Sequence, residues 1–298
     1  MNFRKFGNSN LEISEISFGC MSLQENSADD IKLIQTAFDK GINYFDTADL
    51  YQNGENEILL GKAVKSFRDQ IIIGTKVGNK LRENGEGWDW NPSKRYIIKA
   101  VEYSLKRLQT DYIDLYQLHG GTIDDPIDET IDAFETLIEQ GKIRHYGISS
   151  IRPNVIRSYV QRSNITSVMM QYSLLDRRPE ESCLELLLEN NISVLARGTL
   201  AKGLLAGKSI KEYLDHSVLE VEQNLEKLKD VSNDNLSLKE AAIQFVLKHS
   251  AISSSVIGIR TKKQLLDCLE TLKSPLFSDV TYQKLLNTIS IHRYKNHR

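Results

Sequence analysis

The sequence predicts an α/β protein built as a single (β/α)₈ or TIM barrel over residues 1–298, with a β-hairpin before the barrel and an extra helical segment after it. Short apolar runs alternate with longer segments of helical periodicity, and this alternation occurs eight times. No linker rich in Gly, Ser or Pro divides the chain. A doubly wound sheet is the alternative, but it would need more compact units or a second domain.

The predicted elements follow in order along the chain. Residues 3–7 and 11–16 flank a turn-like segment and predict the leading hairpin. Apolar runs predict the eight barrel strands at 16–21, 43–49, 70–78, 113–120, 145–150, 167–173, 193–200 and 254–259. Helical periodicity predicts helices at 28–41, 56–66, 92–109, 127–142, 152–163, 180–191, 237–250 and 261–273, with a final piece at 281–292. We interpret residues 201–237 as an insertion after the seventh strand, and residues 79–91 and 174–180 as loops.

Composition excludes several classes of protein. The net charge of -2 does not predict binding to nucleic acid or to an anionic membrane, because both attract proteins with excess positive charge. Three widely spaced cysteines and six scattered histidines predict neither a disulfide framework nor a metal site. The N-terminus has no secretory h-region, and no apolar stretch is long enough to span a bilayer. We therefore expect a cytoplasmic protein, of an oligomeric state that the sequence does not reveal.

Polar residues recur where the predicted strands end, which is where barrels of this type form their active sites. They are Asp46, Asp49, Tyr51, Lys76, His119, Ser149, Ser150, Gln171, Arg197 and Arg260. Asp46 and Tyr51 are five positions apart, so a continuing strand would send them to opposite faces. They share one face only if the strand stops between them, and Asn53-Gly54 supplies turn chemistry just after.

This set of residue types suits proton transfer by a phenol. A free phenol is a weak acid with a pKa near ~10, and a neighbouring ammonium favours its ionised form. Asp46 would keep Lys76 charged and positioned, and His119 could hydrogen-bond a substrate oxygen or share the proton. The arrangement suits a carbonyl oxygen that gains negative charge as hydride arrives at carbon. Each residue alone is more often structural, but three successive strand ends carry them together.

Other motifs predict less. The segment GLLAGKS at 203–209 lacks the glycine spacing of a phosphate-binding loop, and no G-x-G-x-x-G follows the first strand. Trp88 and Trp90 fit either the mouth of an apolar pocket or ordinary loop packing.

With these residues assembled, the sequence resembles the aldo-keto reductase superfamily over nearly the whole chain. The residues at 43–64 resemble its Asp/Tyr signature. Further motifs of the family are matched, in the same order, at 71–78, 104–120, 141–150, 169–178, 194–208 and 255–269. The resemblance implies an NADPH-dependent reductase of aldehydes and ketones that binds its cofactor without a Rossmann fold.

The resemblance also implies roles for individual residues. Tyr51 is the expected general acid, Lys76 and Asp46 tune it, and His119 orients the substrate. Met21, Trp88 and His119 are expected to line the substrate pocket. The expected cofactor-binding residues are Gly19, Cys20, Met21, Asp46, Ser149, Ser150, Gln171, Arg197, Gly198, Thr199, Leu200, Lys202, Gly203, Gly258, Arg260, Gln264, Asp267 and Cys268.

The chain departs from the family pattern at three places. Ser149-Ser150 replaces Ser-Asn, Arg197 replaces an aromatic residue expected against the nicotinamide, and Asp267-Cys268 replaces the Glu-Asn pair at the adenine. Arg260, Lys262 and Lys263 favour NADP over NAD by charge. The expected partner is a small carbonyl substrate. The alternative function is a nicotinamide-binding regulatory or sensor protein with little turnover.

Overall fold

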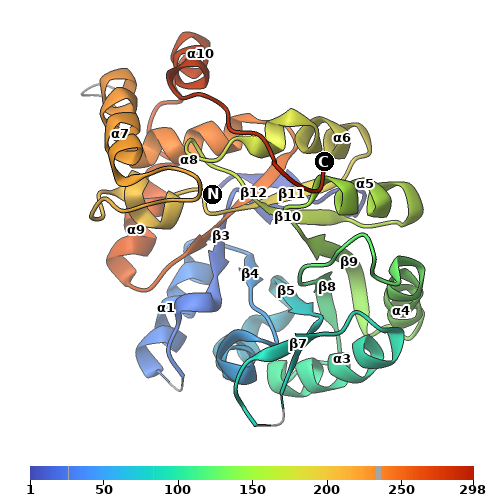
Figure 1. Cartoon of the computed structure of the whole chain (residues 1–298). Coiled ribbons are helices and arrows are strands. Elements are labelled where there is room, and N and C mark those ends of the chain that lie inside the picture. Colours follow the sequence, from blue (N-terminus) through green and yellow to red (C-terminus); the bar gives the residue numbers. More distant parts are fainter. Residues whose placement is uncertain (26, 83, 233–235) are drawn as a thin grey trace.

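A closed barrel of eight parallel strands forms the centre of the computed structural model, which describes residues 1–25, 27–82, 84–232 and 236–298. Around the barrel the strands follow the order β10-β11-β12-β3-β4-β5-β8-β9 (Figure 1). Their bounds are β3 Ile16–Gly19, β4 Tyr44–Asp46, β5 Ile72–Val77, β8 Ile113–Leu118, β9 Ile143–Ser149, β10 Ser167–Gln171, β11 Ser193–Arg197 and β12 Ile252–Gly258. The predicted fold class is confirmed.

Helices surround the barrel, with α7 and α10 packed together beyond the ring (Figure 1). The α-helices are α1 Ala28–Asp39, α2 Glu55–Val64, α3 Lys94–Leu108, α4 Ile127–Glu139, α5 Pro153–Arg162, α6 Cys183–Glu189, α7 Val218–Ser232, α8 Leu238–Lys248, α9 Lys262–Glu270 and α10 Asp279–Thr288. Short 3₁₀ helices are η1 Cys20–Ser22, η2 Tyr51–Gly54, η3 Lys65–Gln70, η4 Arg178–Glu181 and η5 Ala201–Ala206.

Serine side chains begin several of these helices. Ser27, Ser93 and Ser237 each accept a hydrogen bond from a backbone N–H in the first turn of α1, α3 and α8, respectively. At α8 the Glu240 side chain returns to the Ser237 backbone and completes a capping box. The starts of these three helices are therefore fixed locally, by a serine just before the first helical residue.

Two antiparallel hairpins accompany the barrel. The first pairs β1 Phe3–Lys5 with β2 Glu12–Ser14, as predicted. The second pairs β6 Asn79–Leu81 with β7 Trp88–Trp90, so the prediction of a plain loop over 79–91 was wrong. Gly85 and Gly87 adopt positive φ between β6 and β7, a conformation that glycine adopts at little cost and that lets the chain reverse there.

Several predicted boundaries were also wrong. Most barrel strands end before the predicted residue, because the polar residues at their ends leave the sheet: β8 ends at Leu118 and β11 at Arg197. The helix predicted over 180–191 is divided into η4 and α6 at Ser182, whose φ of -161° is not helical. The 201–237 insertion contains η5 and α7.

The core has two parts. Inside the barrel lies a cluster made of Phe6, Ile13, Tyr44, Ile72, Leu115, Met169, Leu195 and Val256, so the first hairpin closes one end of the barrel. A larger cluster fills the layer between strands and helices. Alternation along β5 shows the two sides, because Ile72 belongs to the inner cluster and Ile73 to the outer one. The inner cluster leaves the opposite end of the barrel to polar residues.

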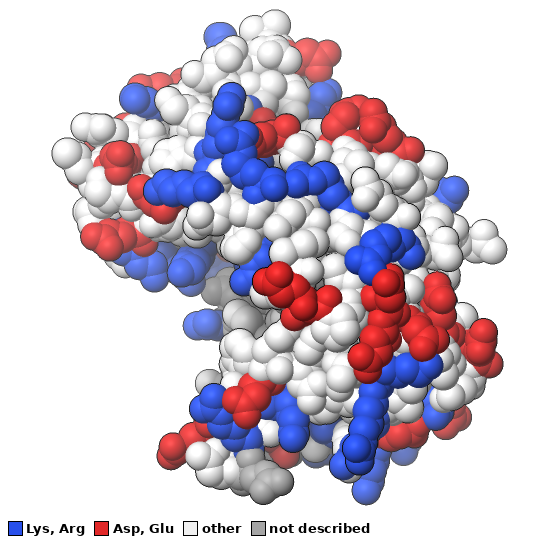
Figure 2. All heavy atoms as spheres, turned by 45° about the vertical axis from the view of Figure 1, so that its right-hand side comes forward, with Lys and Arg blue, Asp and Glu red and all other residues white. Residues whose placement is uncertain are grey.

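The surface charge is mixed on the face shown in Figure 2. Figure 2 shows lysines, arginines, aspartates and glutamates interspersed over the face that it presents, in keeping with the net charge of -2. Within the described ranges, no helix has the length and apolar character needed to cross a bilayer.

Candidate active site

Strand β4 ends at Asp46, and the chain turns before it reaches Tyr51, as the odd spacing requires. Tyr51 begins η2, where Gln52 and Asn53 take φ values of 49° and 54°, and Gly54 takes 93°. Three left-handed residues in succession are uncommon outside sharp turns. The turn brings the Tyr51 phenol back over the end of the barrel from which Asp46 and Lys76 project.

Lys76, in β5, lies at the centre of this group and is 1% exposed. Its Nζ donates to Asp46 Oδ2 at 2.6 Å, to the Thr47 carbonyl at 2.7 Å and to the Tyr51 hydroxyl at 3.5 Å. The Tyr44 hydroxyl donates to the other oxygen of Asp46 at 3.4 Å. A buried ammonium thus has three oxygen acceptors, and its carboxylate partner has a second donor.

Glycine at position 74 makes this arrangement possible. A Cβ at that position would lie 2.1 Å from the Tyr44 hydroxyl, much closer than van der Waals contact. Gly74 therefore leaves the space through which Tyr44 reaches Asp46, and register pairs Asp46 with Gly74 across β4 and β5.

The opposite charges of Lys76 and Asp46 act against the effect of burial on their pKa values. Burial alone would lower the pKa of Lys76, but Asp46 and Tyr51 outweigh it, so the pKa of the ammonium is raised. Burial raises the pKa of Asp46, and Lys76 acts against that shift. The short contact between Nζ and Oδ2 fits an ionised pair, so Lys76 presents a positive charge to the Tyr51 phenol.

His119 lies just past the end of β8 and faces Tyr51. The two rings meet edge to face, with centroids 5.9 Å apart and an interplanar angle of 82°. Burial lowers the pKa of His119 to about 3, with Lys76 and Arg197 adding to the shift, so the imidazole is neutral. Its Nδ1 is buried with no hydrogen-bond partner in the described part of the chain. His119 is thus a neutral hydrogen-bonding group beside the phenol.

Gln171 and Arg197 form a second polar group at the ends of β10 and β11, where the two residues are register partners. Arg197 Nη1 donates to Gln171 Oε1 at 3.0 Å. Gln171 Nε2 donates to Asp176 Oδ2 at 3.0 Å and to the Tyr213 hydroxyl at 3.1 Å. The sequence did not single out Asp176 and Tyr213. Asp176 follows the predicted sixth strand closely, but Tyr213 comes from the insertion and gave no signal.

Ser149 and Ser150 differ in their surroundings. Ser149 ends β9 and is half-buried. Ser150 is 6% exposed, and its hydroxyl accepts from the Arg152 backbone N–H at 3.2 Å, within its own turn. Ser149 is therefore the serine whose side chain is available at this end of the barrel.

The segment after β11 is tightly turned. Gly198, Ala201, Lys202 and Gly203 all have positive φ, between 47° and 97°. The Thr199 hydroxyl contacts the Ser255 hydroxyl at 2.7 Å and ties this segment to β12. Lys202 is exposed, Gly198 and Leu200 are half-buried, and the other residues of the segment are buried.

Unpaired cations gather where β12 leads into α9. Arg260, Lys262 and Lys263 are exposed, and none forms an ion pair with another described residue. Thr261 caps the helix by accepting from Gln264 N–H, and Gln264 Oε1 accepts from Arg260 N–H at 2.9 Å. Cations beside a helix N-terminus suit a phosphate group.

The remaining residues singled out from the sequence lie around these groups. Gly19 pairs in register with Gly258, Cys20 is fully buried, and Met21 is 62% exposed. Asp267 is half-buried, whereas Cys268 is 4% exposed and packs in the outer core, so its side chain faces away from solvent.

The two tryptophans of the second hairpin behave differently. Trp88 is 46% exposed, whereas the Trp90 indole donates to Asp125 Oδ1 at 3.0 Å and packs against the core. Across the described residues, no three His, Cys, Asp or Glu side chains are grouped so as to hold a metal ion.

Comparison with known proteins identifies the family. The model of the Aldo/keto reductase family matches residues 15–285. The chain belongs to this family. Membership makes the protein an oxidoreductase of the aldo/keto reductase type, acting on carbonyl groups of small molecules.

Individual aldo/keto reductases and their relatives are similar over the full length. The chain is 48% identical over 307 residues to the uncharacterized oxidoreductase YqkF of Bacillus subtilis (strain 168), covering 100% of both. The holo form of aldo-keto reductase AKR11C1 from Bacillus halodurans superposes with a TM-score of 0.95 at 46% identity, over 100% of this chain and 99% of that one. The apo form of AKR11C1 gives a TM-score of 0.86 at 43% identity, with the same coverage.

Proposed function

We propose that this aldo/keto reductase reduces aldehydes and ketones with NADPH, and that Tyr51 is the general acid. The observation that carries the proposal is the position of Lys76 Nζ, 2.6 Å from Asp46 and 3.5 Å from the Tyr51 hydroxyl. An acid must be able to give up its proton, and a cation beside the phenol stabilises the phenolate that remains.

In the proposed mechanism, NADPH would supply, when bound, the hydride that reduces the carbonyl carbon. Tyr51 donates its proton to the carbonyl oxygen as that oxygen gains negative charge. Lys76 holds a positive charge beside the resulting phenolate, and Asp46 keeps the lysine charged and in place. His119, neutral and edge to face with the Tyr51 ring, is suited to hydrogen-bond the substrate oxygen and orient it.

The residues at this end of the barrel are compatible with NADPH as the cofactor. As the family resemblance implies, Ser149 and Gln171 would hold the carboxamide, Arg197 would stack on the nicotinamide ring, and the segment 198–203 would bind the pyrophosphate. The three unpaired cations at α9 give a charge of the sign that a 2′-phosphate needs, and this favours NADPH over NADH. The greater similarity to the holo form of AKR11C1, 0.95 against 0.86 in TM-score, also supports a shape compatible with cofactor.

We propose that the substrate enters beside Met21, Trp88 and His119. Met21 and Trp88 are large apolar side chains with exposed fractions of 62% and 46%, which suits contact with an apolar part of a substrate. The three cysteines are all free thiols, which supports a reducing compartment such as the cytoplasm as the place of this activity.

Substitution Tyr51→Phe tests the acid role. The ring and its packing remain while the proton is lost, so we expect kcat/KM for a panel of aldehydes to fall by about 10²–10⁴-fold. Binding of NADPH, followed by quenching of tryptophan fluorescence, should be unchanged. Equal losses of binding and turnover would contradict the acid role. Tight NADPH binding by the unmodified protein, with no turnover of any carbonyl in the panel, would instead identify a sensor.

A further inference from the structure

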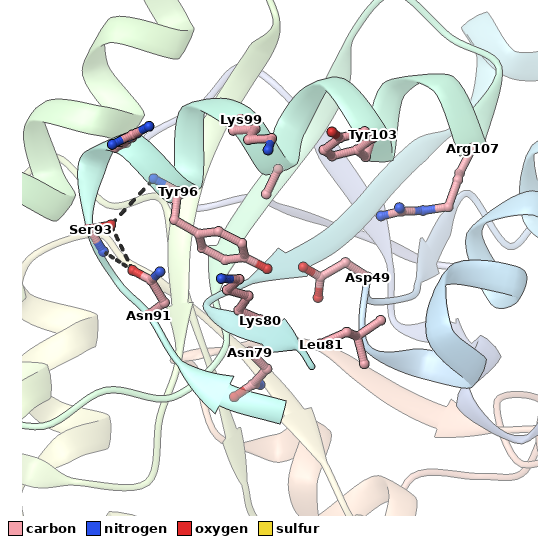
Figure 3. Close-up of a pocket in the computed structure, with 12 residues that line it drawn as sticks. Asp49, Asn79, Lys80, Leu81, Asn91, Ser93, Tyr96, Lys99, Tyr103 and Arg107 are labelled. Carbon is pink, nitrogen blue, oxygen red and sulfur yellow. Dashed lines mark hydrogen bonds between the residues drawn. The ribbon is translucent and has the colours of Figure 1, made fainter. Parts of the chain in front are cut away.

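A second cavity lies outside the barrel, between the β6–β7 hairpin, α3 and the turn that follows β4 (Figure 3). Its volume is about 560 Å³, within the usual range of small-molecule sites. None of the four residues proposed for catalysis lines it. The lining residues are Asp49, Asn79, Lys80, Leu81, Asn91, Ser93, Arg95, Tyr96, Lys99, Ala100, Tyr103 and Arg107.

Asp49 is the unusual member of this lining. It is 7% exposed, and its Oδ1 is buried without a hydrogen-bond partner among the residues that the structure describes. Figure 3 shows its carboxyl group pointing into the cavity, toward the Tyr96 ring. Burial raises the pKa of Asp49 well above its usual range, with Glu57 adding to the shift and Arg107 opposing it. A buried polar atom without a partner is costly, so it marks a place where a ligand atom would be stabilised.

The rim of the cavity is positively charged. Lys80, Arg95 and Lys99 are exposed, and within the described ranges none of them forms an ion pair. Arg107 is the exception, because its Nε donates to the fully buried Glu57 at 2.6 Å. Asp89 interacts with Lys80, and the Lys99 ammonium lies 6.0 Å from the centroid of the Tyr103 ring, but neither lysine forms an ion pair within the described ranges. The cations of the rim attract an anion and repel a cation, which rules against a purely cationic ligand for Asp49.

Aromatic rings complete the wall. Tyr96 and Tyr103 both project from α3, and Figure 3 shows the Tyr96 ring between Lys80 and the helix. Tyrosine offers an apolar face with a polar tip, a combination that suits a molecule with both carbon and hydroxyl groups. Asn79 and Asn91 add further hydrogen-bonding groups along the hairpin side.

We propose that this cavity binds a small anionic polyol, whose phosphate or carboxylate contacts Lys80, Arg95 and Lys99 and whose hydroxyl group hydrogen-bonds Asp49. The anion satisfies the rim cations, the hydroxyl satisfies the unpartnered Oδ1, and the cavity volume accommodates a chain or ring of sugar size. The site is distinct from the cations at α9, which belong to the proposed cofactor site.

Isothermal titration calorimetry on the full chain, without added cofactor, tests the proposal. The probes are glucose 6-phosphate and gluconate. The controls are inorganic phosphate, which has the anionic group alone, and glucose, which has the hydroxyl groups alone. We expect saturable binding of at least one anionic polyol, with higher affinity than that of inorganic phosphate or glucose. Glucose 6-phosphate separates a phosphate ligand from the carboxylate ligand represented by gluconate.

Variants locate the binding. Lys99→Gln removes a rim charge, and we expect affinity for the anionic polyol to fall about tenfold, as for loss of one charge-assisted hydrogen bond. Asp49→Leu should weaken the polyol similarly and leave inorganic phosphate unchanged. Lys227→Gln is the matched control and should bind as the wild type does, because Lys227 is exposed on α7 and forms no ion pair with another described residue.

Several results would overturn the proposal. Absence of saturable binding of both anionic polyols to the wild type is one. Equal affinity for inorganic phosphate and glucose 6-phosphate is another, because it removes the role of Asp49. Binding lost in Arg260→Gln but kept in Lys99→Gln would place the anion at α9 instead. Because Lys99→Gln changes an exposed side chain, it tests the rim even if Asp49→Leu fails to fold.

Discussion

Removal of the Lys76 ammonium should destabilise the protein strongly. In Lys76→Met the side chain keeps its approximate length, but Asp46 loses its partner at 2.6 Å while 5% exposed. Breaking a buried ion pair from one side costs about 3–5 kcal/mol, because a buried charge is left uncompensated. At about 2 °C per kcal/mol for a protein of this size, Tm should fall by about 6–10 °C.

The loss of stability in Lys76→Met should depend on pH, and the environment of Asp46 predicts the direction. Burial raises the pKa of Asp46, and in Lys76→Met the opposing effect of the ammonium is gone. The folded state then binds a proton that the unfolded state, with a carboxyl pKa of about 3.9, has already released. The free energy of unfolding of the variant therefore falls as pH rises through the raised pKa. The difference in Tm from the wild type should be larger at pH 8 than at pH 5.

Differential scanning calorimetry of four proteins checks this reasoning: wild type, Asp46→Asn, Lys76→Met and the double variant. The double variant removes both charges and should recover much of the loss, because replacing both members of a buried pair is often neutral. A fall in Tm of less than about 2 °C in Lys76→Met would refute the argument. A double variant no more stable than Lys76→Met would refute it as well.

Three further predictions concern other parts of the molecule. The NMR signal of the His119 Hε1 proton should not titrate between about pH 5 and 8, since the pKa is lowered to about 3; a midpoint near 6.5 would contradict this. Because the unfolded imidazole binds a proton that the folded one does not, His119 should lower stability as pH falls below about 6.5. Gly74→Ala should cost about 1–3 kcal/mol through the clash with the Tyr44 hydroxyl, and Tyr44→Phe in the same chain should relieve part of it; additive losses in urea unfolding would count against the clash. Ser237→Ala should cost about 1 kcal/mol by removing the capping box of α8, with Ser237→Gly costing less; no change in either variant would show that the cap contributes nothing.

The sequence was sufficient for the barrel because each unit carries its own local signal. Apolar runs such as 71–73 have a period that separates strands from helices, and Gly41 follows α1 with a positive φ. The β6–β7 hairpin was missed although β1 and β2, which also have three residues each, were predicted, so short strands alone do not account for the miss. Its register depends instead on Trp90, which packs in the outer core and donates to Asp125, a residue far along the chain.

The sequence predicted which residues form the candidate site, but it did not predict all of their contacts. Strand-end placement predicted that Asp46, Tyr51, Lys76 and His119 would share one end of the barrel, and the structure places them there. The hydrogen bonds around Gln171 were not predictable, because Tyr213 reaches it from an insertion with no regular pattern. The cavity at Asp49 was missed for a related reason: burial of that carboxyl depends on side chains of α3, about fifty positions later.

The hairpin that closes the barrel has a consequence for how the chain is made. Arg4 Nη1 donates to the Ile252 carbonyl, and the Lys5 carbonyl accepts from the Ser253 hydroxyl, each across 248 positions. At a synthesis rate of about 5–20 residues per second, Phe6 and Ile13 wait roughly 12–50 s for the strand that completes their burial. During that time Phe6 can pack against Tyr44, but the inner cluster lacks the side chain that β12 contributes. Contacts of such long range also slow refolding, so recovery from denaturant should improve at low protein concentration, where exposed hairpins rarely meet.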